Sequence, residues 1–326
     1  MSNPIKVMSI DGGGIRGIIP AMVLAEIEKR TGKRISELFH LIAGTSTGGI
    51  LALGLTKAGA DGKPEYTAEK GIELYEKRGE RIFWRPFWRR IPLVSGLLEE
   101  KYPSHGIEEV LGQYFGEARL KDALTDVLVT SYDIERSKPY FFKSTKAKEE
   151  AVRDCPMRWA ARATSAAPTY FEPAKLQIEG SSDYRALIDG GVFANNPAMC
   201  ALVEARSTHP DADSFLLVSL GTGELTRRLP YDEAKGWGLA GWAQPVLSVV
   251  FDGVSDAVDY QLGKLLPATD GNRRYYRLQV KLDESNDAMD DASAGNIRVL
   301  KLLAEEMISA NDSALTVLCN QLAPPN

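Results

Sequence analysis

The sequence contains few cysteines and few histidines. Among its 326 residues there are three of each. Cys155, Cys200 and Cys319 are far apart and form no C-x-x-C pair. This spacing indicates neither a metal knuckle nor a disulfide framework, and it favours a reducing compartment.

Long apolar runs are also absent. No run approaches the roughly 18 residues that a membrane-spanning helix needs, and the segment Met1–Lys6 is too short and polar to begin a secretory signal peptide. The formal net charge of −5 disfavours a protein that binds nucleic acid. We therefore expect a cytoplasmic protein with no nucleic-acid partner.

The sequence has no internal repeat, no low-complexity linker and no clear domain boundary. Short apolar runs at residues 5–10, 126–133 and 215–220 alternate with amphipathic helical patterns. That alternation is typical of an α/β fold with a mostly parallel central sheet. The run at 215–220 is apolar throughout and predicts a central parallel strand. We expect a single α/β domain over residues 1–326.

Three further segments predict secondary structure in the second half of the chain. Small residues over 158–171 predict a helix that stops at Pro168 and packs against the sheet. Residues 225–270 are mostly helical in pattern, and residues 274–280 predict a late strand.

The functional prediction depends on a G-x-S-x-G pattern, Gly44-Thr45-Ser46-Thr47-Gly48. An apolar run before it predicts a buried strand, and an apolar run after it predicts a helix. A strand that turns at once into a helix strains its central residue, and only small neighbours such as Gly44 and Gly48 avoid a clash. The turn exposes the Ser46 hydroxyl above a helix N-terminus, where negative charge is stabilised. The alternative is a tight turn in which Ser46 only caps the helix.

A glycine-rich loop, Asp11-Gly12-Gly13-Gly14-Ile15-Arg16-Gly17, follows the first predicted strand and precedes a predicted helix over residues 18–30. Its spacing also fits the G-x-G-x-x-G loop of dinucleotide-binding proteins. That fingerprint needs an acidic residue at the end of the second strand, but Glu37 precedes this strand and Ser46 follows it. The combination of this glycine loop with Ser46 favours an oxyanion hole, in which consecutive glycine N–H groups bind a developing alkoxide.

Residues 82–98 combine tryptophan, phenylalanine and arginine and are interrupted by prolines. Trp84, Phe87 and Trp88 lie among three arginines, a composition typical of segments at a membrane interface. The alternative is a lid packed over the core, and the two roles are compatible. We therefore predict a peripheral membrane contact through these three residues.

A serine nucleophile needs a proton acceptor, and none of the three histidines has a convincing position. His209 lies in a polar loop at a helix end, and His105 lies in a loop without a signature. His40 precedes the strand that leads to Ser46, near the wrong end of that strand. Each histidine is expected to be structural or exposed.

Asp189 is better placed than any histidine. It follows a predicted strand over residues 184–188 and is followed by Gly190 and Gly191. An acid at the carboxyl end of a strand lies where open α/β sheets bind their ligands. A partly desolvated carboxylate is basic enough to activate a serine. Taken alone, the motif is also typical of a simple turn.

The ordered set of motifs resembles the patatin-like phospholipases. The resemblance rests on the glycine loop at 11–17, the G-x-S-x-G pattern at 44–48 and Asp189-Gly190-Gly191, with support from 163–168 and 221–223. It covers residues 5–225. We expect 226–326 to be a helical extension of the same domain.

The resemblance implies a three-layer α/β/α fold and a Ser–Asp dyad that cleaves acyl esters of lipids without a metal or an organic cofactor. In these terms Ser46 is the nucleophile and Asp189 the general base. The N–H groups of Gly12, Gly13 and Gly14 form the oxyanion hole, with Arg16 beside it.

Several functional alternatives stay open. Acyl transfer, or hydrolysis of non-phospholipid esters, uses the same residues. A non-catalytic lipid- or nucleotide-binding module on the same fold is a third reading. The resemblance also admits a bacterial membrane-degrading defence effector that a small molecule such as a cyclic nucleotide switches on. The sequence shows no residues that indicate such a nucleotide site.

Overall fold

The computed structural model describes residues 3–83, 102–180, 182–225, 229–242, 245–269, 271–283 and 285–324. The residues predicted to face a membrane, Trp84, Phe87 and Trp88, lie outside these ranges.

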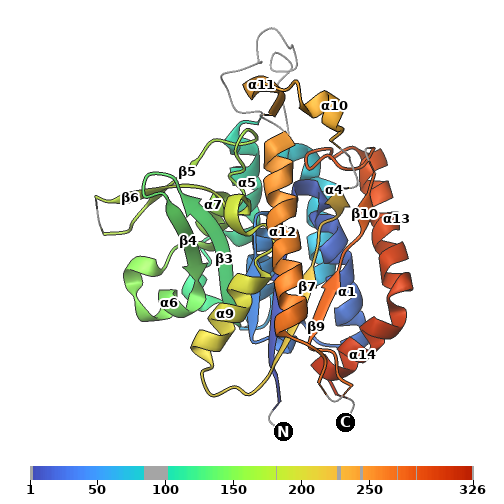
Figure 1. Cartoon of the computed structure of the whole chain (residues 1–326). Coiled ribbons are helices and arrows are strands. Elements are labelled where there is room, and N and C mark those ends of the chain that lie inside the picture. Colours follow the sequence, from blue (N-terminus) through green and yellow to red (C-terminus); the bar gives the residue numbers. More distant parts are fainter. Residues whose placement is uncertain are drawn as a thin grey trace.

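A central eight-stranded sheet organises the chain, in the order β5-β6-β3-β2-β1-β7-β9 with β4 on β3 (Figure 1). Five neighbouring strands, β3, β2, β1, β7 and β9, are parallel, whereas β4 and β6 run antiparallel to β3, and β5 runs antiparallel to β6. The strands are β1 (Ile5–Ile10), β2 (Leu41–Gly44), β3 (Asp126–Asp133), β4 (Lys138–Lys143), β5 (Ala174–Gln177), β6 (Tyr184–Asp189), β7 (Phe215–Leu220) and β9 (Tyr275–Leu278). A small parallel pair joins β8 (Glu224–Leu225) to β10 (Lys281–Leu282).

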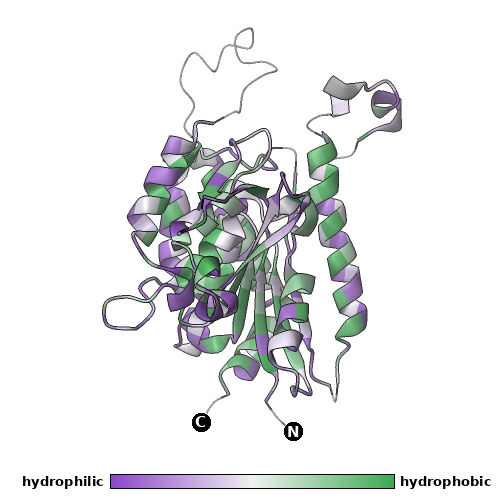
Figure 2. Ribbon diagram, turned by 90° about the vertical axis from the view of Figure 1, so that its left-hand side faces the viewer, coloured by the Kyte–Doolittle hydropathy of each residue, from purple (hydrophilic) through white to green (hydrophobic). Residues whose placement is uncertain are grey.

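Helices cover both faces of this sheet, because side chains of the strands point alternately to either side. Met8, Ile10 and Ile42 pack on one face, whereas Val7 and Ala43 pack on the other. The first face is covered by α1 (Ile18–Thr31), α3 (Thr47–Thr56), α4 (Ala68–Ile82), α5 (Ser104–Phe115), α7 (Met157–Thr164), α13 (Ala294–Ala310) and α14 (Asp312–Leu322). The second is covered by α9 (Ala198–Thr208) and α12 (Pro245–Leu265). Hydrophobic strands lie inside this shell of helices (Figure 2). The predicted three-layer α/β/α fold is confirmed.

Short elements complete the chain. They are a 3-10 turn at Gly14–Gly17, α2 (Ile35–Leu38), α6 (Ser144–Glu149), α8 (Gly191–Ala194), α10 (Tyr231–Ala234) and α11 (Leu239–Trp242). The two termini lie at one end of the molecule, and α10 and α11 lie beyond the other end (Figure 1).

Two expected elements differ from the structure. The small-residue helix ends at Thr164 rather than at Pro168, because Ser165 turns its hydroxyl back to the carbonyl of Ala161 (2.8 Å) and Thr169 has a φ of 71°. The C-terminal part is more than a helical extension, since the strand predicted over residues 274–280 is present as β9 and lies in the central sheet beside β7.

The strand β6 has an unusual position that matters for the site. Its last residues pair with β3 at Ser131–Asp133, whereas β2 pairs with β3 at Asp126–Val129. The strand β4 pairs with β3 across both stretches, so it occupies the opposite edge of β3. The strands β2 and β6 therefore lie on the same edge of β3 and meet end to end, each with its C-terminal end at the junction.

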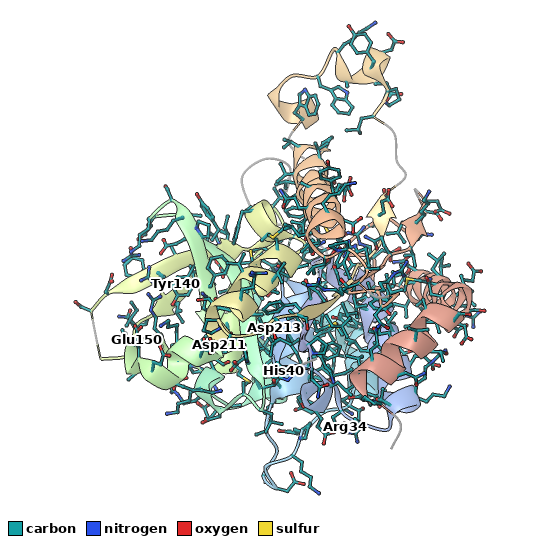
Figure 3. The ribbon with its side chains drawn as sticks, turned by 60° about the horizontal axis from the view of Figure 1, so that its bottom comes forward. Arg34, His40, Tyr140, Glu150, Asp211 and Asp213 are labelled. Carbon is teal, nitrogen blue, oxygen red and sulfur yellow. The ribbon has the colours of Figure 1, made fainter. Side chains whose placement is uncertain are left out.

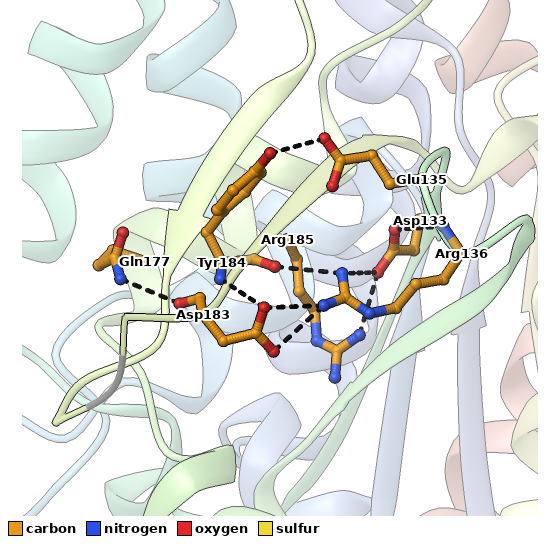
Figure 4. A network of polar contacts seen from close by, with 7 residues as sticks. All are labelled: Asp133, Glu135, Arg136, Gln177, Asp183, Tyr184 and Arg185. Carbon is orange, nitrogen blue, oxygen red and sulfur yellow. Dashed lines mark hydrogen bonds and ion pairs between the residues drawn. The ribbon is translucent and has the colours of Figure 1, made fainter.

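A network of polar contacts holds the outer end of β6 against β3 (Figure 4). Arg136 binds the Asp183 carboxylate (2.9 and 3.1 Å) and the carbonyl of Tyr184 (3.1 Å). Arg185 binds the fully buried Asp133 carboxylate (3.0 Å), which also accepts the Arg136 amide (3.1 Å). Bonds between ionised partners are stronger than neutral ones. The network therefore fixes the register that places Asp189 opposite Ser131.

Candidate active site

Ser46 lies on a strained turn between β2 and α3. Its φ of 54° is rare for a residue other than glycine, and its amide donates to the Thr164 hydroxyl (2.8 Å). A side chain at Gly48 would collide with the carbonyl of Ile10, and one at Gly44 would collide with the backbone of Gly48. Only glycine fits at these two positions, as the pattern predicted.

Asp189 ends β6 and faces Ser46 across the junction of β2 and β6. Its side chain is buried, and its Oδ1 accepts the amide of Gly191 (2.8 Å). A side chain at Gly190 would collide with Thr130. Asp189 therefore lies at the C-terminal end of its strand, as the sequence predicted. This strand runs antiparallel to β3 and meets β2 end to end, an arrangement that the sequence did not indicate.

The environment of Asp189 makes it an effective proton acceptor. Burial raises the pKa of Asp189 to about 7, although hydrogen bonds from the Ser46 hydroxyl and the Gly191 amide lower it. A base whose pKa is close to neutral combines an available carboxylate with a strong affinity for the proton.

The three histidines lie away from this pair. The Nδ1 atom of His40 accepts the amide of Lys6 (2.9 Å), and the ring of His209 lies 6.2 Å from the ring of His40. His40 directly precedes β2 and is labelled in Figure 3, at the end of the strand opposite to Ser46. The side chain of His105 is 80% exposed, 3.8 Å from Glu109. The structure brings together Ser46 and Asp189 without a histidine.

The glycine loop lies against Ser46, but its three amides are not equivalent. A Cβ added to Gly12 would lie 3.2 Å from the Cβ of Ser46. The Gly12 amide already donates to the carbonyl of Asn195 (3.0 Å), so the prediction that it forms part of an oxyanion hole is wrong for this conformation. The amides of Gly13 and Gly14 have no hydrogen-bond partner among the described residues.

Arg16 does not point into the same space as these amides. Its side chain is buried on the other side of the loop, where Nε donates to the carbonyl of Gly13 (3.3 Å) and Nη1 to that of Asp287 (3.2 Å). The resemblance implies that Arg16 lies beside the oxyanion hole, and in the structure its guanidinium donates to these two carbonyls. Arg16 braces the loop whose amides face Ser46.

Two neighbours of the site were not predicted. Thr47 follows Ser46 at the first position of α3, where amides lack an intrahelical acceptor. Its side chain bonds the Tyr75 hydroxyl, and both would collide with a side chain at Gly17.

The second neighbour is Met289. Its backbone carbonyl accepts the Ile15 amide (2.8 Å) and lies close to Gly14, whose φ is 60°. The G-x-S-x-G pattern could have indicated Thr47, but no local pattern indicated Met289.

An apolar pocket, here called the apolar slot, opens at Ser46 and Asp189. Its volume is about 710 Å³, including the part open to solvent, which is in the range of sites for small ligands. Its walls come from α3, α4, α5 and the segment after α7, and they include Ile50, Leu74, Tyr75, Ile82, Phe83, Ile107 and Phe171. The amides of Gly13 and Gly14 lie at the same opening. The arrangement fits an acyl chain in the slot with its carbonyl beside Ser46.

The dinucleotide interpretation of the glycine loop finds no support in the geometry. The Glu37 carboxylate accepts the amide of Arg34 (2.7 Å) and caps α2 before β2 begins. Within the described ranges, no three His, Cys, Asp or Glu side chains are grouped to hold a metal ion. No helix in the part of the chain that the structure describes has the length and apolarity to cross a membrane.

Comparison with known proteins gives a consistent picture. A family model described as "Patatin-like phospholipase" matches residues 8–202. "Patatin-like protein 4" and "Patatin-like protein 2" of Arabidopsis thaliana are 30% and 32% identical to this chain. These alignments cover 95% and 94% of this chain and 84% and 83% of the relatives.

Two further matches add less support for a catalytic function. "Probable inactive patatin-3-Kuras 1" of Solanum tuberosum is 31% identical over 95% of this chain and 87% of its own length. The crystal structure of VipD from Legionella pneumophila aligns with 94% of this chain and 67% of its own, at 10% identity and a TM-score of 0.36. That structural likeness is too weak to support an inference.

Proposed function

Since this chain belongs to the patatin-like phospholipase family, whose members are lipid acyl hydrolases, we propose that it cleaves acyl esters of phospholipids through an acyl-serine on Ser46. Asp189 acts as the general base. The observation that carries the proposal is the buried Asp189 carboxylate beside Ser46 at the mouth of the apolar slot.

The proposed reaction has two half-steps. The Asp189 carboxylate takes the hydroxyl proton as the Ser46 oxygen attacks the ester carbonyl, and the amides of Gly13 and Gly14 stabilise the oxyanion. Collapse of this intermediate breaks the ester C–O bond, and Asp189 returns its proton to the leaving lysolipid or alcohol. Water then attacks the acyl-serine with Asp189 again as the base, which releases a fatty acid and regenerates Ser46.

Contact with a membrane surface is part of the proposal. The described residues at the end of the molecule that carries α10 and α11 include exposed apolar side chains of Tyr231, Trp242, Val246 and Val249. The rings of Trp237 and Trp242 pack at 5.2 Å. Aromatic side chains of this kind are enriched at the depth of lipid headgroups. The sequence also predicts a membrane contact through Trp84, Phe87 and Trp88, which lie outside the residues that the structure describes.

The proposal does not include activation by a small molecule or a role in defence, because no feature of the described residues specifies either. Acyl transfer is the second candidate, since the same acyl-serine can react with an alcohol in place of water. The strained Ser46 turn and the base beside it disfavour a non-catalytic binding module.

The proposal is tested by product analysis and active-site labelling. We expect the purified protein to release fatty acid from phosphatidylcholine vesicles and nitrophenol from p-nitrophenyl butyrate. A fluorophosphonate should label the peptide that contains Ser46, as read by mass spectrometry. Label on another serine, or no fatty acid from any ester, would contradict the proposal. An acylated product that appears when an alcohol is added would identify acyl transfer instead.

Leu74 is expected to limit the length of acyl chain that the slot accepts. Leu74 and Ile50 line both the apolar slot and a second apolar pocket between α3, α4 and α5. The change Leu74→Ala should join the two, and each methylene buried contributes about 0.8 kcal/mol, or roughly fourfold. If the enlarged slot buries one or two further methylenes of a long chain, the rate ratio of p-nitrophenyl palmitate to octanoate should rise roughly tenfold.

The matched control for Leu74→Ala is Leu315→Ala. It removes the same atoms from a buried leucine in α14, far from the slot. Both variants should lose about 2–5 kcal/mol of stability. Only Leu74→Ala should change the chain-length ratio. An equal ratio in the two variants would mean that the second pocket does not take substrate.

A further inference from the structure

A second, polar pocket adjoins the apolar slot across the glycine loop. Tyr170, Asn195, Phe251 and Met289 line both cavities, so their openings meet beside Ser46. The remaining lining is dominated by carboxylates, and we call this cavity the acidic pocket. Its acidic residues are Asp11, Glu224, Asp252, Asp256, Asp287 and Asp290, and its one cationic lining residue among those described is Arg16.

Three carboxylates of the acidic pocket have no cationic partner among the described residues. Among the described residues, Asp252, Asp256 and Glu224 form no ion pair. Asp252 and Asp256 lie one turn apart on α12. Burial raises the pKa of Asp252 to about 6, which Arg16 opposes and the charges of Asp256 and Glu224 reinforce. The three carboxylates therefore repel one another in a site that a positive charge would stabilise.

Arg16 cannot supply that charge alone. Its Nε and Nη1 atoms are held by the carbonyls of Gly13 and Asp287, so the guanidinium faces backbone oxygens. One cation is also too few for the three carboxylates that lack an ion pair.

Asp11 gives an independent indication of a missing ligand. It is 1% exposed and lines the acidic pocket. Its Oδ2 accepts from Arg277 (2.7 Å), but its Oδ1 is buried and has no hydrogen-bond partner among the described residues. Buried carboxylate oxygens are almost always paired, so an unpaired one at the wall of a cavity indicates that a donor is absent.

We propose that the acidic pocket binds the positively charged nitrogen of a lipid headgroup while the acyl chain of the same lipid occupies the apolar slot. The inference rests on the proposed function and names its substrate class, the zwitterionic phospholipids with an ethanolamine or choline headgroup. Phe251 and Tyr170, at the boundary of the two cavities, add aromatic faces that attract an ammonium group.

The test compares short-chain phospholipids as monomers, which removes the effect of vesicle surface charge. Values of kcat/KM are measured for dihexanoyl phosphatidylethanolamine, phosphatidylcholine and phosphatidylglycerol, each divided by the rate on p-nitrophenyl butyrate. The first two should exceed phosphatidylglycerol at least tenfold. In the double variant Asp252→Asn/Asp256→Asn this preference should fall to within threefold. The control Glu306→Gln, an exposed carboxylate on α13, should keep the preference of the unmodified protein.

Each other result has a definite meaning. Equal rates on the three lipids, or a preference that survives in the double variant, would overturn the headgroup assignment. Stimulation by calcium that disappears in the double variant would assign the pocket to a metal ion and also overturn it. Failure of the proposed function can be distinguished from failure of the headgroup assignment, because in that case neither the lipids nor p-nitrophenyl butyrate would be hydrolysed.

Discussion

Replacement of Ser46 by alanine is expected to reduce ester hydrolysis by about 10⁴-fold or more while leaving the fold intact. The nucleophile acts as a unit with its base, so its loss removes nearly all the chemistry. Alanine and serine meet the same strain at the φ of 54°, so the turn should persist. Rates on phosphatidylcholine vesicles and p-nitrophenyl butyrate, with circular dichroism and thermal unfolding, measure both parts.

The matched control for Ser46→Ala is Ser207→Ala, which removes an exposed hydroxyl from α9. It should keep full activity and full labelling by a fluorophosphonate. Hydrolysis that continues in Ser46→Ala within tenfold of the unmodified rate would rule out Ser46 as the nucleophile.

The change Asp189→Asn is expected to lower hydrolysis by about 10³–10⁴-fold, since a general base contributes roughly 10²–10⁴ and its loss also disturbs the serine. In the unmodified protein the rate should rise with pH through about 7, because only the deprotonated carboxylate accepts the proton. Asp189→Asn should lose this limb of the pH profile. His209→Ala should keep both the rate and the profile, and a large loss there would instead indicate a triad.

The same substitution is expected to stabilise the protein at high pH. The folded pKa of about 7 lies above the ordinary value of 3.8, so the folded state binds more protons than the unfolded state between these values. Stability must then fall as pH rises from about 4 to 7, by up to about 4 kcal/mol at 1.36 kcal/mol per pKa unit. Asparagine carries no charge and removes this loss, so Asp189→Asn should be more stable at pH 8 by about 2–4 kcal/mol.

Urea unfolding at pH 5 and pH 8 measures this effect. The exposed Asp211→Asn serves as a matched control and should change neither value by more than about 0.5 kcal/mol. If Asp189→Asn is less stable than the unmodified protein at pH 8, the buried carboxylate is stabilised by its surroundings and is a poor candidate for the base.

The sequence predicted the local parts of the site well, because local geometry depends on local residues. The turn at Ser46 needs Gly44 and Gly48 within four positions of each other, and the loop at 11–17 carries its own consecutive amides. The positions of the predicted strands at 5–10, 126–133 and 215–220 also followed from short apolar runs.

The relations between distant segments could not be predicted in the same way. Nothing in residues 184–189 states that this strand runs antiparallel to β3 or that it meets β2 end to end. The acceptor of the Gly12 amide is Asn195, and the loop pattern alone does not indicate that this amide is already satisfied. Phe251 and Met289 enter the site from a region that carries no recognisable motif.

The end-to-end meeting of β2 and β6 also determines when the protein becomes competent during folding. Ser46 and Asp189 face each other only after two strands that are distant in sequence have both docked on β3. Contacts of such large sequence separation form late, because a long loop must close before they contribute. A refolding chain should therefore regain its helices and its compactness well before it regains the reaction with a fluorophosphonate. Reaction of the proposed dyad with a fluorophosphonate therefore indicates that both strands have docked on the edge of β3. Partly folded chains that still expose apolar surface should not react.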